Sequence, residues 1–262
     1  MKSQFRLKKT QHTITIFNNM KKKISLNNIL NDKVHGSSDI LKRFIIYLNE
    51  NSKDISKLKS ALPLVRKKFS HFPGISGIVD QLKIALKNNN TLELTELINS
   101  YKKNNTNTFI RIFDNAEKEL RNYNTLLTIS HSRTLIEIFR FLKKINPRLK
   151  VLVCESRPLN EGKLLAEELR IHKIKNQIIT EAATGKIIKQ VDAVVIGADQ
   201  IFKNGSIVNK TGSRMLAIIA KYERIPVYVL ASKSKLITKQ TAKLPEEFEE
   251  VESKLISKIF TD

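Results

Sequence analysis

The stretch VDAVVIGADQIFKNGSIVNKTGS, residues 191–213, decides the fold of this chain. The apolar run 193–196 ends in Gly-Ala-Asp, and a helix-like segment begins after Gly212. A short apolar run between turn residues is typical of a strand that is buried on both faces. The sequence therefore places an acid, Asp199, at the end of a buried strand, with Lys210 close behind it.

An alternation of such strands with helices is predicted over residues 121–262. Further strands are predicted at TLLTIS (125–130), KVLVCES (150–156), NQIITEA (176–182) and PVYVLA (226–231), with helical segments between them. Strands that alternate with helices of about a dozen residues predict a parallel sheet covered on both faces, which is a doubly wound α/β domain. Such a domain binds its ligands at the carboxyl ends of the strands.

Residues 32–120 follow a helical pattern instead. DILKRFIIYLNE (39–50) repeats apolar residues at steps of three and four, and GIVDQLKIALKN and LELTELINSYKK behave alike. No strand is predicted here, so this region is expected to form a helical domain. The polar segment 102–108 predicts a break between helices, followed by a last helix over 109–123 that leads into the α/β domain.

The charge of the chain is strongly basic, with 47 Lys and Arg against 25 Asp and Glu, a net charge of +22. Residues 1–31 hold seven basic residues and no acid, which predicts a basic N-terminal arm. Such a charge favours RNA or acidic protein surfaces as partners, although a general bias of composition toward Lys explains it equally well. The chain has 12 Phe, five Tyr and no Trp, and most of these aromatic residues have the spacing of core positions. No aromatic surface for base stacking is therefore predicted, and any RNA contact is expected to be made through phosphate groups.

The composition also bears on compartment and cofactors. No run approaches the roughly 18 apolar residues of a membrane span, and the N-terminus lacks the apolar region of a secretory signal. The single cysteine, Cys154, excludes an internal disulfide and a multi-cysteine zinc site. No dinucleotide, P-loop or zinc motif is present, so we expect a cytoplasmic protein without a metal or cofactor.

Polar residues gather where the predicted strands end. Because the carboxyl ends of parallel strands meet at one edge, these residues are expected to line a crevice for a small, polar, anionic ligand. The predicted ligand-binding set is Ser130, Ser132, Arg133, Glu155, Arg157, Glu181, Asp199, Asn209 and Lys210.

Each of these residues also has a structural interpretation. Ser130 or Ser132 would serve as an N-cap, and Arg157 would form a surface salt bridge. Asp199 would cap a helix or bridge to Lys210. These alternatives stay open at the level of sequence.

Four segments carry a family resemblance: CESRPLNEGKLLAEEL (154–169), TEAA (180–183), the run 191–236 and the C-terminal LPEEFEEVESKLISKIFTD. With their Glu-x-Arg-Pro, Gly-Ala-Asp and Asn-Lys-x-Gly spacing, they resemble the family of the alpha, beta and delta subunits of translation initiation factor 2B. The family also contains ribose 1,5-bisphosphate isomerase and methylthioribose-1-phosphate isomerase. The resemblance implies a helical N-terminal domain, a Rossmann-like C-terminal domain and homo- or hetero-oligomers assembled through the latter. It also implies a GTPase, initiation factor 2, as a candidate partner.

The resemblance separates two functions. In the isomerases a cysteine after the first strand works with the aspartate of Gly-Ala-Asp, and that cysteine position falls on Ser130 here. A serine hydroxyl is a far weaker acid than a thiol with a pKa of about 8.5, so it replaces a proton donor poorly. The sequence favours a non-catalytic initiation factor 2B-like subunit. The alternative is a sugar-phosphate isomerase that uses Asp199 and Ser130.

Two arginines that bind phosphate in the isomerases also have no counterpart in the predicted alignment. The Arg-Gly-Ala loop is matched to His35-Gly36-Ser37, and the arginine of an Arg-Pro-Thr segment is matched to Leu62. Each arginine would normally make a bidentate charged contact, so both replacements favour the factor over the isomerase.

Overall fold

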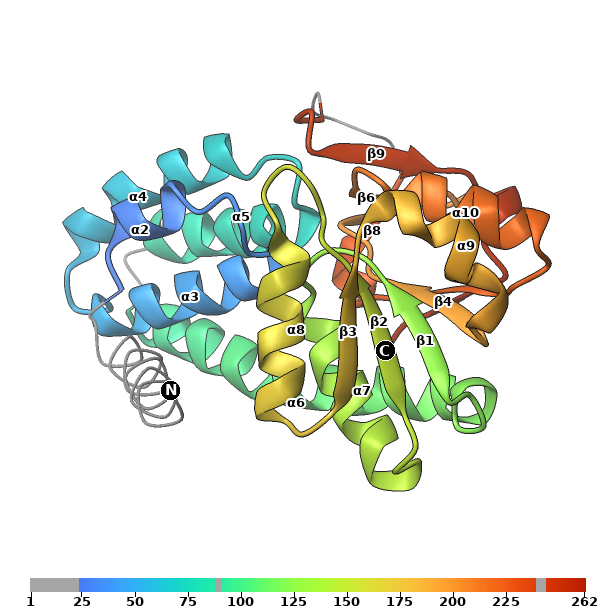
Figure 1. Cartoon of the computed structure of the whole chain (residues 1–262). Helices are drawn as coiled ribbons and strands as arrows, with labels where there is room; N and C mark the ends of the chain where they lie inside the picture. The colour runs from blue at the N-terminus through green and yellow to red at the C-terminus, as the bar shows by residue number, and fades with distance from the viewer. Residues whose placement is uncertain (1–23, 88–90, 239–243) are drawn as a thin grey trace, which may run out of the picture.

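The structure, a computed structural model, describes residues 24–87, 91–238 and 244–262. Most of the basic arm expected over residues 1–31 lies outside these ranges. The described chain forms a helical part and an α/β part that lie side by side (Figure 1). No helix within the described ranges is long and apolar enough to span a membrane.

The helical part has one apolar core. It is built by α2 (Leu26–Leu30), α3 (Ser37–Glu50), α4 (Ile55–Lys68), α5 (Pro73–Lys87) and the first half of α6 (Thr91–Leu120). Most of the apolar residues of these helices turn inward, as the spacing of three and four predicted, while Leu64, Ile84 and Leu92 are exposed. Ile29 of α2 is fully buried in this core, so the helical part begins before residue 32, where the sequence placed its start.

Helix α6 joins the two parts of the molecule. Its first half packs into the helical core through Leu94 and Ile98, and its second half packs into the α/β core through Ile112 and Ala116. The helix is continuous from 91 to 120, so the predicted break at 102–108 is wrong. Packing at both ends of a helix outweighs the modest helix propensity of Asn and Thr between them.

A six-stranded parallel sheet organises the α/β part. Its strands run in the order β10-β7-β4-β1-β2-β3, which from the β3 edge is the order 3-2-1-4-5-6 of a Rossmann fold. The strands are β1 (Thr125–Thr128), β2 (Lys150–Cys154), β3 (Lys175–Ile179), β4 (Ala193–Ile196), β7 (Val227–Leu230) and β10 (Lys258–Phe260). The predicted class, a helical domain followed by a Rossmann-like doubly wound domain, is confirmed.

Helices cover both faces of this sheet (Figure 1). On one face, α7 (Arg133–Ile145), α8 (Glu161–Ile171) and the end of α6 share a core with the strands. On the other face, α10 (Ser213–Tyr222) shares a second core with them, and the short helix α9 (Thr184–Ile187) lies beside α10. Residues on both faces of the central strands are buried, which explains their continuous apolar runs.

The sequence did not predict a second sheet, which lies near the carboxyl ends of the main strands (Figure 1). Its order is β8-β5-β6-β9, and its strands are β5 (Gln200–Phe202), β6 (Ile207–Lys210), β8 (Leu236–Ile237) and β9 (Phe248–Val251). The predicted turn at 203–205 is confirmed, because Gly205 has a φ of +81° and the Phe202 N–H donates to Ser206 O at 2.9 Å. The resulting hairpin carries Asn209 and Lys210 back toward Asp199.

Candidate functional site

The sheet changes its direction of winding between β1 and β4, and the candidate site lies just beyond these two strands. Ser130 follows β1 and Asp199 follows β4. In a doubly wound sheet this position leaves a crevice at the carboxyl ends, because the connecting helices depart to opposite faces. Ser130 and Asp199 therefore belong to the place where such folds bind small molecules.

The loop after β1 has a constrained backbone. Ser130 has a φ of 66° and Ser156, after β2, has a φ of 65°, in the left-handed region that costs about 1–3 kcal/mol for a residue with a side chain. The Ser130 N–H donates to Ser156 Oγ at 2.6 Å, and the Ser156 N–H donates to Glu181 Oε1 at 2.5 Å. Hydrogen bonds thus tie the ends of three neighbouring strands together.

Six of the nine predicted residues share one narrow crevice. It is lined from the α/β part by Ser130, Ser132, Arg133, Asp199, Asn209 and Lys210, and from the helical part by Gly36, Ser37 and Ser38. Its cavity volume is about 20 Å³, enough for roughly one water molecule. The crevice is a narrow contact between the two parts of the molecule.

Asp199 joins the two walls of this crevice. Its Oδ1 accepts a hydrogen bond of 2.6 Å from the Ser37 hydroxyl at the start of α3. Gly36, which precedes Ser37, lies so close to the β1 loop that a Cβ atom there would be 3.1 Å from His131 O. The predicted interpretation of Asp199 as a bridge to Lys210 is wrong, because Lys210 has a different carboxylate partner.

That partner is Glu161, at the start of α8. Lys210 Nζ lies 3.1 Å from Glu161 Oε1, and both side chains are nearly buried. The ammonium also lies 4.6 Å from the ring centroid of Phe248 on β9, a cation–π distance. Asn209 supports the same region, since its Nδ2 donates to Ser213 Oγ at 2.8 Å.

A second buried lysine, Lys235, was not predicted. Its Nζ donates to the carbonyl oxygen of Ala198, at the end of β4. Burial lowers the pKa of this ammonium, and the nearby carboxylates of Asp199 and Asp39 oppose that shift. No periodicity of the sequence singles this lysine out, because it sits in a short 3-10 turn (Lys233–Lys235).

The segment that follows β1 has structural partners. Ser132 is the N-cap of α7 and accepts from the Leu135 N–H at 3.4 Å, so the predicted capping alternative is what the structure shows. Arg133 lies 2.5 Å from Glu137, one helical turn along. His131, which is not in the predicted ligand-binding set, is buried, with Nε2 2.9 Å from Glu168 Oε1 and Nδ1 3.4 Å from Asp39 Oδ2.

Three predicted residues do not join the crevice. Arg157 is 65 % exposed and pairs with Glu155 at 3.0 Å, which is the predicted salt-bridge alternative. That hydrogen bond holds the pKa of the Glu155 carboxyl below its usual value, and Lys163 adds to the effect. Glu181 faces the backbone of Ser156. Their prediction as a converging set with Asp199 is therefore wrong.

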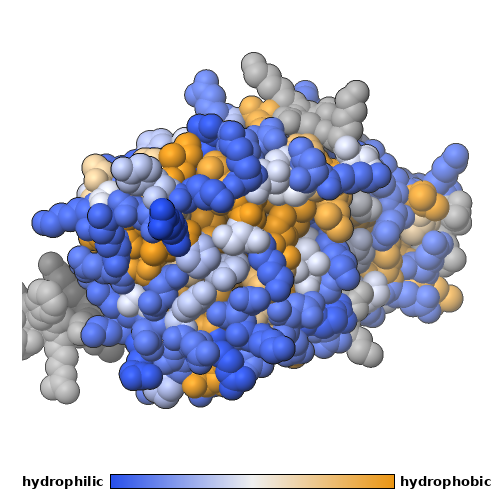
Figure 2. All heavy atoms as spheres, turned by 90° about the vertical axis from the view of Figure 1, so that its right-hand side faces the viewer, coloured by the Kyte–Doolittle hydropathy of each residue, from blue (hydrophilic) through white to orange (hydrophobic). Residues whose placement is uncertain are grey.

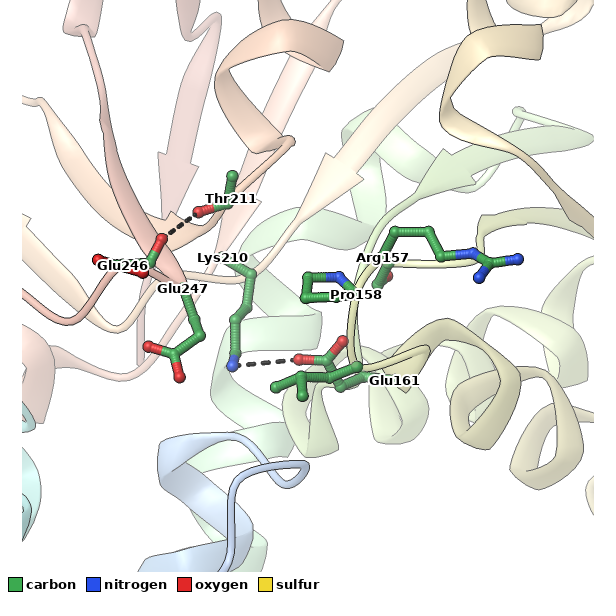
Figure 3. A pocket seen from close by; sticks show the side chains of 9 residues that line it. Arg157, Pro158, Glu161, Lys210, Thr211, Glu246 and Glu247 are labelled. Carbon is green, nitrogen blue, oxygen red and sulfur yellow. Dashed lines mark hydrogen bonds and ion pairs between the residues drawn. The ribbon is translucent and has the colours of Figure 1, made fainter.

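Two larger cavities adjoin the crevice at Lys210. One, of about 490 Å³, is lined by Arg157, Pro158, Glu161, Thr211, Glu246 and Glu247 among others. Figure 3 shows Lys210 directed toward Glu161 inside it, with the guanidinium of Arg157 turned away. The other, of about 270 Å³, is lined by His35, Lys68, His71, Phe72 and Phe248 among others. Lys210 lines all three cavities.

Neither residue aligned with an arginine of the isomerases supplies a cation of that kind. His35 lies at the rim of the second of these cavities and binds Asp32 through Nδ1 at 2.8 Å. Leu62 is buried in the helical core and does not line the crevice. The proline that approaches Asp199 is Pro73, and the residue before it is Phe72.

Cys154 lies outside these cavities. It is fully buried in the apolar core between the sheet and α10, and burial raises the pKa of its thiol to about 12. In the part of the chain that the structure describes, no group of His, Cys, Asp and Glu side chains is arranged to hold a metal ion.

The fold and the crevice define a class of protein: a Rossmann-like domain whose carboxyl edge is closed by a helical domain, with an acid and a lysine at the junction. Comparison with known proteins narrows this class. The sequence model of the initiation factor 2 subunit family matches residues 9–259, and the chain belongs to that family. The resemblance found in the sequence is confirmed.

Relatives from both branches of the family match the chain. It is 29 % identical over 229 residues to a putative translation initiation factor eIF-2B subunit 2-like protein of Pyrococcus furiosus, covering 83 % of this chain and 80 % of the relative. It is 33 % identical over 129 residues to ribose 1,5-bisphosphate isomerase of Archaeoglobus fulgidus, covering 49 % of this chain and 41 % of the relative. Family membership alone therefore does not separate the factor from the isomerase.

Solved structures share the fold. Translation initiation factor eIF-2B of Pyrococcus horikoshii OT3 superposes with a TM-score of 0.79 at 21 % identity, over 90 % of this chain and 93 % of that one. A chain of the tetrameric eIF2B-beta2-delta2 complex of C. thermophilum superposes with a TM-score of 0.68 at 14 % identity, over 90 % and 87 %. Members of the family thus occur in oligomeric complexes.

Proposed function

We propose that this protein is a non-catalytic subunit of the initiation factor 2B type, with a regulatory or assembly role in translation initiation. One observation carries the proposal: the residue that faces Asp199 across the end of the sheet is Ser130, and the single cysteine of the chain is buried elsewhere. Moving a proton between adjacent carbons needs a group that titrates near neutral pH. A serine hydroxyl does not, and the thiol of Cys154 has a pKa of about 12.

The state of Asp199 supports the same proposal. Its carboxylate already accepts the Ser37 hydroxyl, in a crevice that holds about one water molecule. A catalytic base must reach the substrate proton within hydrogen-bonding distance, and one oxygen of Asp199 is already engaged by Ser37. The arrangement suits a residue that holds the helical and α/β parts together.

We further propose that a sugar phosphate or a nucleotide binds as a regulatory ligand beside Lys210. The two adjoining cavities, of about 490 and 270 Å³, are of the size that small-molecule sites occupy. Lys210 lines both, and an anionic group bound there would share its ammonium with Glu161. On this proposal the crevice residues transmit binding between the two parts of the molecule rather than contact the ligand directly.

The family relationship supports assembly as the biological setting. We propose that the subunit forms homo- or hetero-oligomers through its α/β domain, acts in the cytoplasm and contacts the GTPase initiation factor 2. The alternative function is isomerisation of a sugar 1-phosphate such as ribose 1,5-bisphosphate or methylthioribose 1-phosphate. The presence of Asp199, Asn209 and Lys210 and the match to ribose 1,5-bisphosphate isomerase favour that alternative.

Turnover measurements with both sugar phosphates separate the two functions. We expect no isomerisation by the wild-type protein, and a higher melting temperature with a bound sugar phosphate or nucleoside monophosphate, since a ligand of the folded state stabilises it. Turnover that disappears in Asp199→Asn would overturn the non-catalytic assignment. If no such compound changes the melting temperature, the proposal of a regulatory ligand is wrong. The proposed subunit role would then be tested separately, by a binding assay with purified initiation factor 2.

A further inference from the structure

The opposite edge of the sheet, where the strands begin, carries an unusual concentration of positive charge. The segments that lead from the ends of α7 and α8 into β2 and β3, residues 143–150 and 170–175, contain seven basic residues and no acid. We call these residues the basic edge: Lys143, Lys144, Arg148, Lys150, Arg170, Lys173 and Lys175. None of the seven is buried.

The topology brings these loops together. Strands β2 and β3 are parallel neighbours, so the segments that precede them emerge at the same end of the sheet, the lower end in Figure 1. Lys150 and Lys175 begin the two strands and are paired in register, about 4.8 Å apart along the sheet. Figure 2 shows mostly hydrophilic side chains over the lower part of the molecule.

Helix ends explain only part of this charge. Lys143, Lys144 and Arg170 lie in the last turns of α7 and α8, where cations complement the helix dipole. Lys143 Nζ also donates to the carbonyl oxygen of Pro147, and Lys144 Nζ lies 5.6 Å from the ring centroid of Phe141. Arg148, Lys150 and Lys175 serve no helix end, whereas Lys173, with a φ of 57°, terminates α8 through its backbone N–H, which donates to the carbonyl oxygen of Arg170.

The nearest carboxylate along this end of the sheet is that of Asp192, which accepts from the N–H groups of Asn124 and Thr125 rather than pairing with a cation of the basic edge. Within residues 24–87, 91–238 and 244–262, none of its seven members forms an ion pair with an acid. Like charges that face one another on neighbouring strands destabilise a sheet, so the pairing of Lys150 with Lys175 lowers stability in the isolated molecule. A polyanion that lay across both loops would reverse the sign of that interaction.

We infer that the basic edge binds RNA through its phosphate backbone. Cations spread over two adjacent loops suit a chain of evenly spaced phosphates. The two loops contain no Phe, Tyr or Trp on which bases could stack, so binding should tolerate any sequence and weaken steeply with salt. An interface with an acidic protein would be expected to have an apolar centre. The exposed apolar side chains of these two segments are single isoleucines, Ile145 and Ile171, on separate helices.

This surface is independent of the proposed subunit function and of the crevice, which lies at the other end of the strands. An RNA-associated subunit could hold its complex near the translation machinery whether or not the crevice binds a ligand. The failure of one proposal therefore leaves the other standing.

The test uses the full chain and a fluorescent oligouridylate of about 20 nucleotides, with anisotropy measured over a range of salt. The variant combines Arg148→Gln, Lys150→Gln, Lys173→Gln and Lys175→Gln. A matched control removes the same charge from exposed lysines of the helical part: Lys53→Gln, Lys59→Gln, Lys67→Gln and Lys83→Gln. Circular dichroism melting establishes that both variants are folded.

We expect the basic-edge variant to bind about tenfold or more weakly at low salt. The slope of log affinity against log salt should fall by about 2–3, from four lost contacts at about 0.7 each for a single strand. The control should stay within about threefold of the wild type with an unchanged slope. Bound RNA should also protect Lys150 and Lys175 from chemical acetylation, read by mass spectrometry.

Three results would overturn the inference. The first is equal weakening in both variants, which would mean that net charge alone attracts RNA. The second is the absence of RNA binding by the wild-type protein. The third is tighter, basic-edge-dependent binding of polyglutamate than of RNA, which would assign the surface to an acidic protein.

Discussion

The two edges of the parallel sheet handle positive charge in opposite ways. At the carboxyl edge, Lys210 pairs with Glu161, Arg157 with Glu155 and Arg133 with Glu137, while the buried Lys235 donates to the carbonyl oxygen of Ala198. At the amino edge, the basic edge has none among the described residues. Both edges are made of loops on the same strands, so backbone geometry does not cause the difference. The buried ammonium of Lys210 has a carboxylate partner, whereas the cations of the basic edge are solvated.

The helical part explains why the carboxyl edge must be paired. It covers that edge through α3, where Ser37 reaches Asp199, and no corresponding element covers the loops before β2 and β3 in the described structure (Figure 1). A charge that is taken out of water needs a partner, whereas a solvated charge does not. The carboxyl edge is therefore covered by the helical part, whereas the basic edge is open to solvent.

The largest effect should come from breaking the buried pair at the carboxyl edge. Lys210→Ala leaves the Glu161 carboxylate, whose side chain is 4 % exposed, without its cation. We expect the free energy of unfolding to fall by about 3–5 kcal/mol in urea denaturation. The double variant Lys210→Met, Glu161→Gln should recover most of this loss.

Arg157→Ala serves as the control for that variant, because it removes a cation that is mostly exposed. Its pair with Glu155 is screened by solvent, so the denaturation midpoint should hardly move. Equal losses for Lys210→Ala and Arg157→Ala would contradict the view that burial distinguishes the two pairs.

A smaller effect should follow from filling the tight contact behind β2. A Cβ atom at Gly162, at the start of α8, would lie 1.8 Å from the Cys154 carbonyl oxygen. We expect Gly162→Ala to destabilise the protein by about 3 kcal/mol, because backbone has to move, and to loosen the loop that holds Ser156. Thermal melting followed by circular dichroism measures the loss.

Gly77→Ala is the matched substitution for Gly162→Ala. Gly77 lies inside α5 with nothing within 4 Å of its added Cβ, so this change should stabilise the protein by up to about 1 kcal/mol through helix propensity. Destabilisation of similar size by both variants would show that the contact with Cys154 is not what requires glycine at Gly162.

The smallest effect should appear at the amino edge and with the opposite sign. Lys175→Gln removes one of two lysines that stand in register, so stability at low salt should rise by about 0.2–1 kcal/mol. The gain should shrink as salt screens the repulsion. Lys221→Gln, on an exposed residue outside the sheet, provides the comparison. A loss of stability in Lys175→Gln would mean that Lys175 makes a stabilising interaction within the protein. It would contradict the view that the cations of the basic edge are unpaired.

Much of the fold followed from local pattern. The alternation of apolar strands and helices predicted the parallel sheet, and the three- and four-residue spacing predicted the helical domain. The short strands of the second sheet escaped prediction because runs such as Leu236–Ile237 are too brief to show a period. The break at 102–108 was predicted from composition, and it failed because packing at both ends of α6 decides the helix there.

Sequence by itself determined which polar residues stand at the ends of strands and that a single cysteine is available. Periodicity and chain order are local properties, so they can be read without coordinates. Only the tertiary structure decided which polar groups meet. The Ser37 hydroxyl donates to Asp199, 162 positions away, and Lys210 pairs with Glu161, whereas the guanidinium of Arg157 is directed away from the cavity. Partners of this kind depend on how distant segments pack, because desolvation and distance, not sequence spacing, set the strength of each pair.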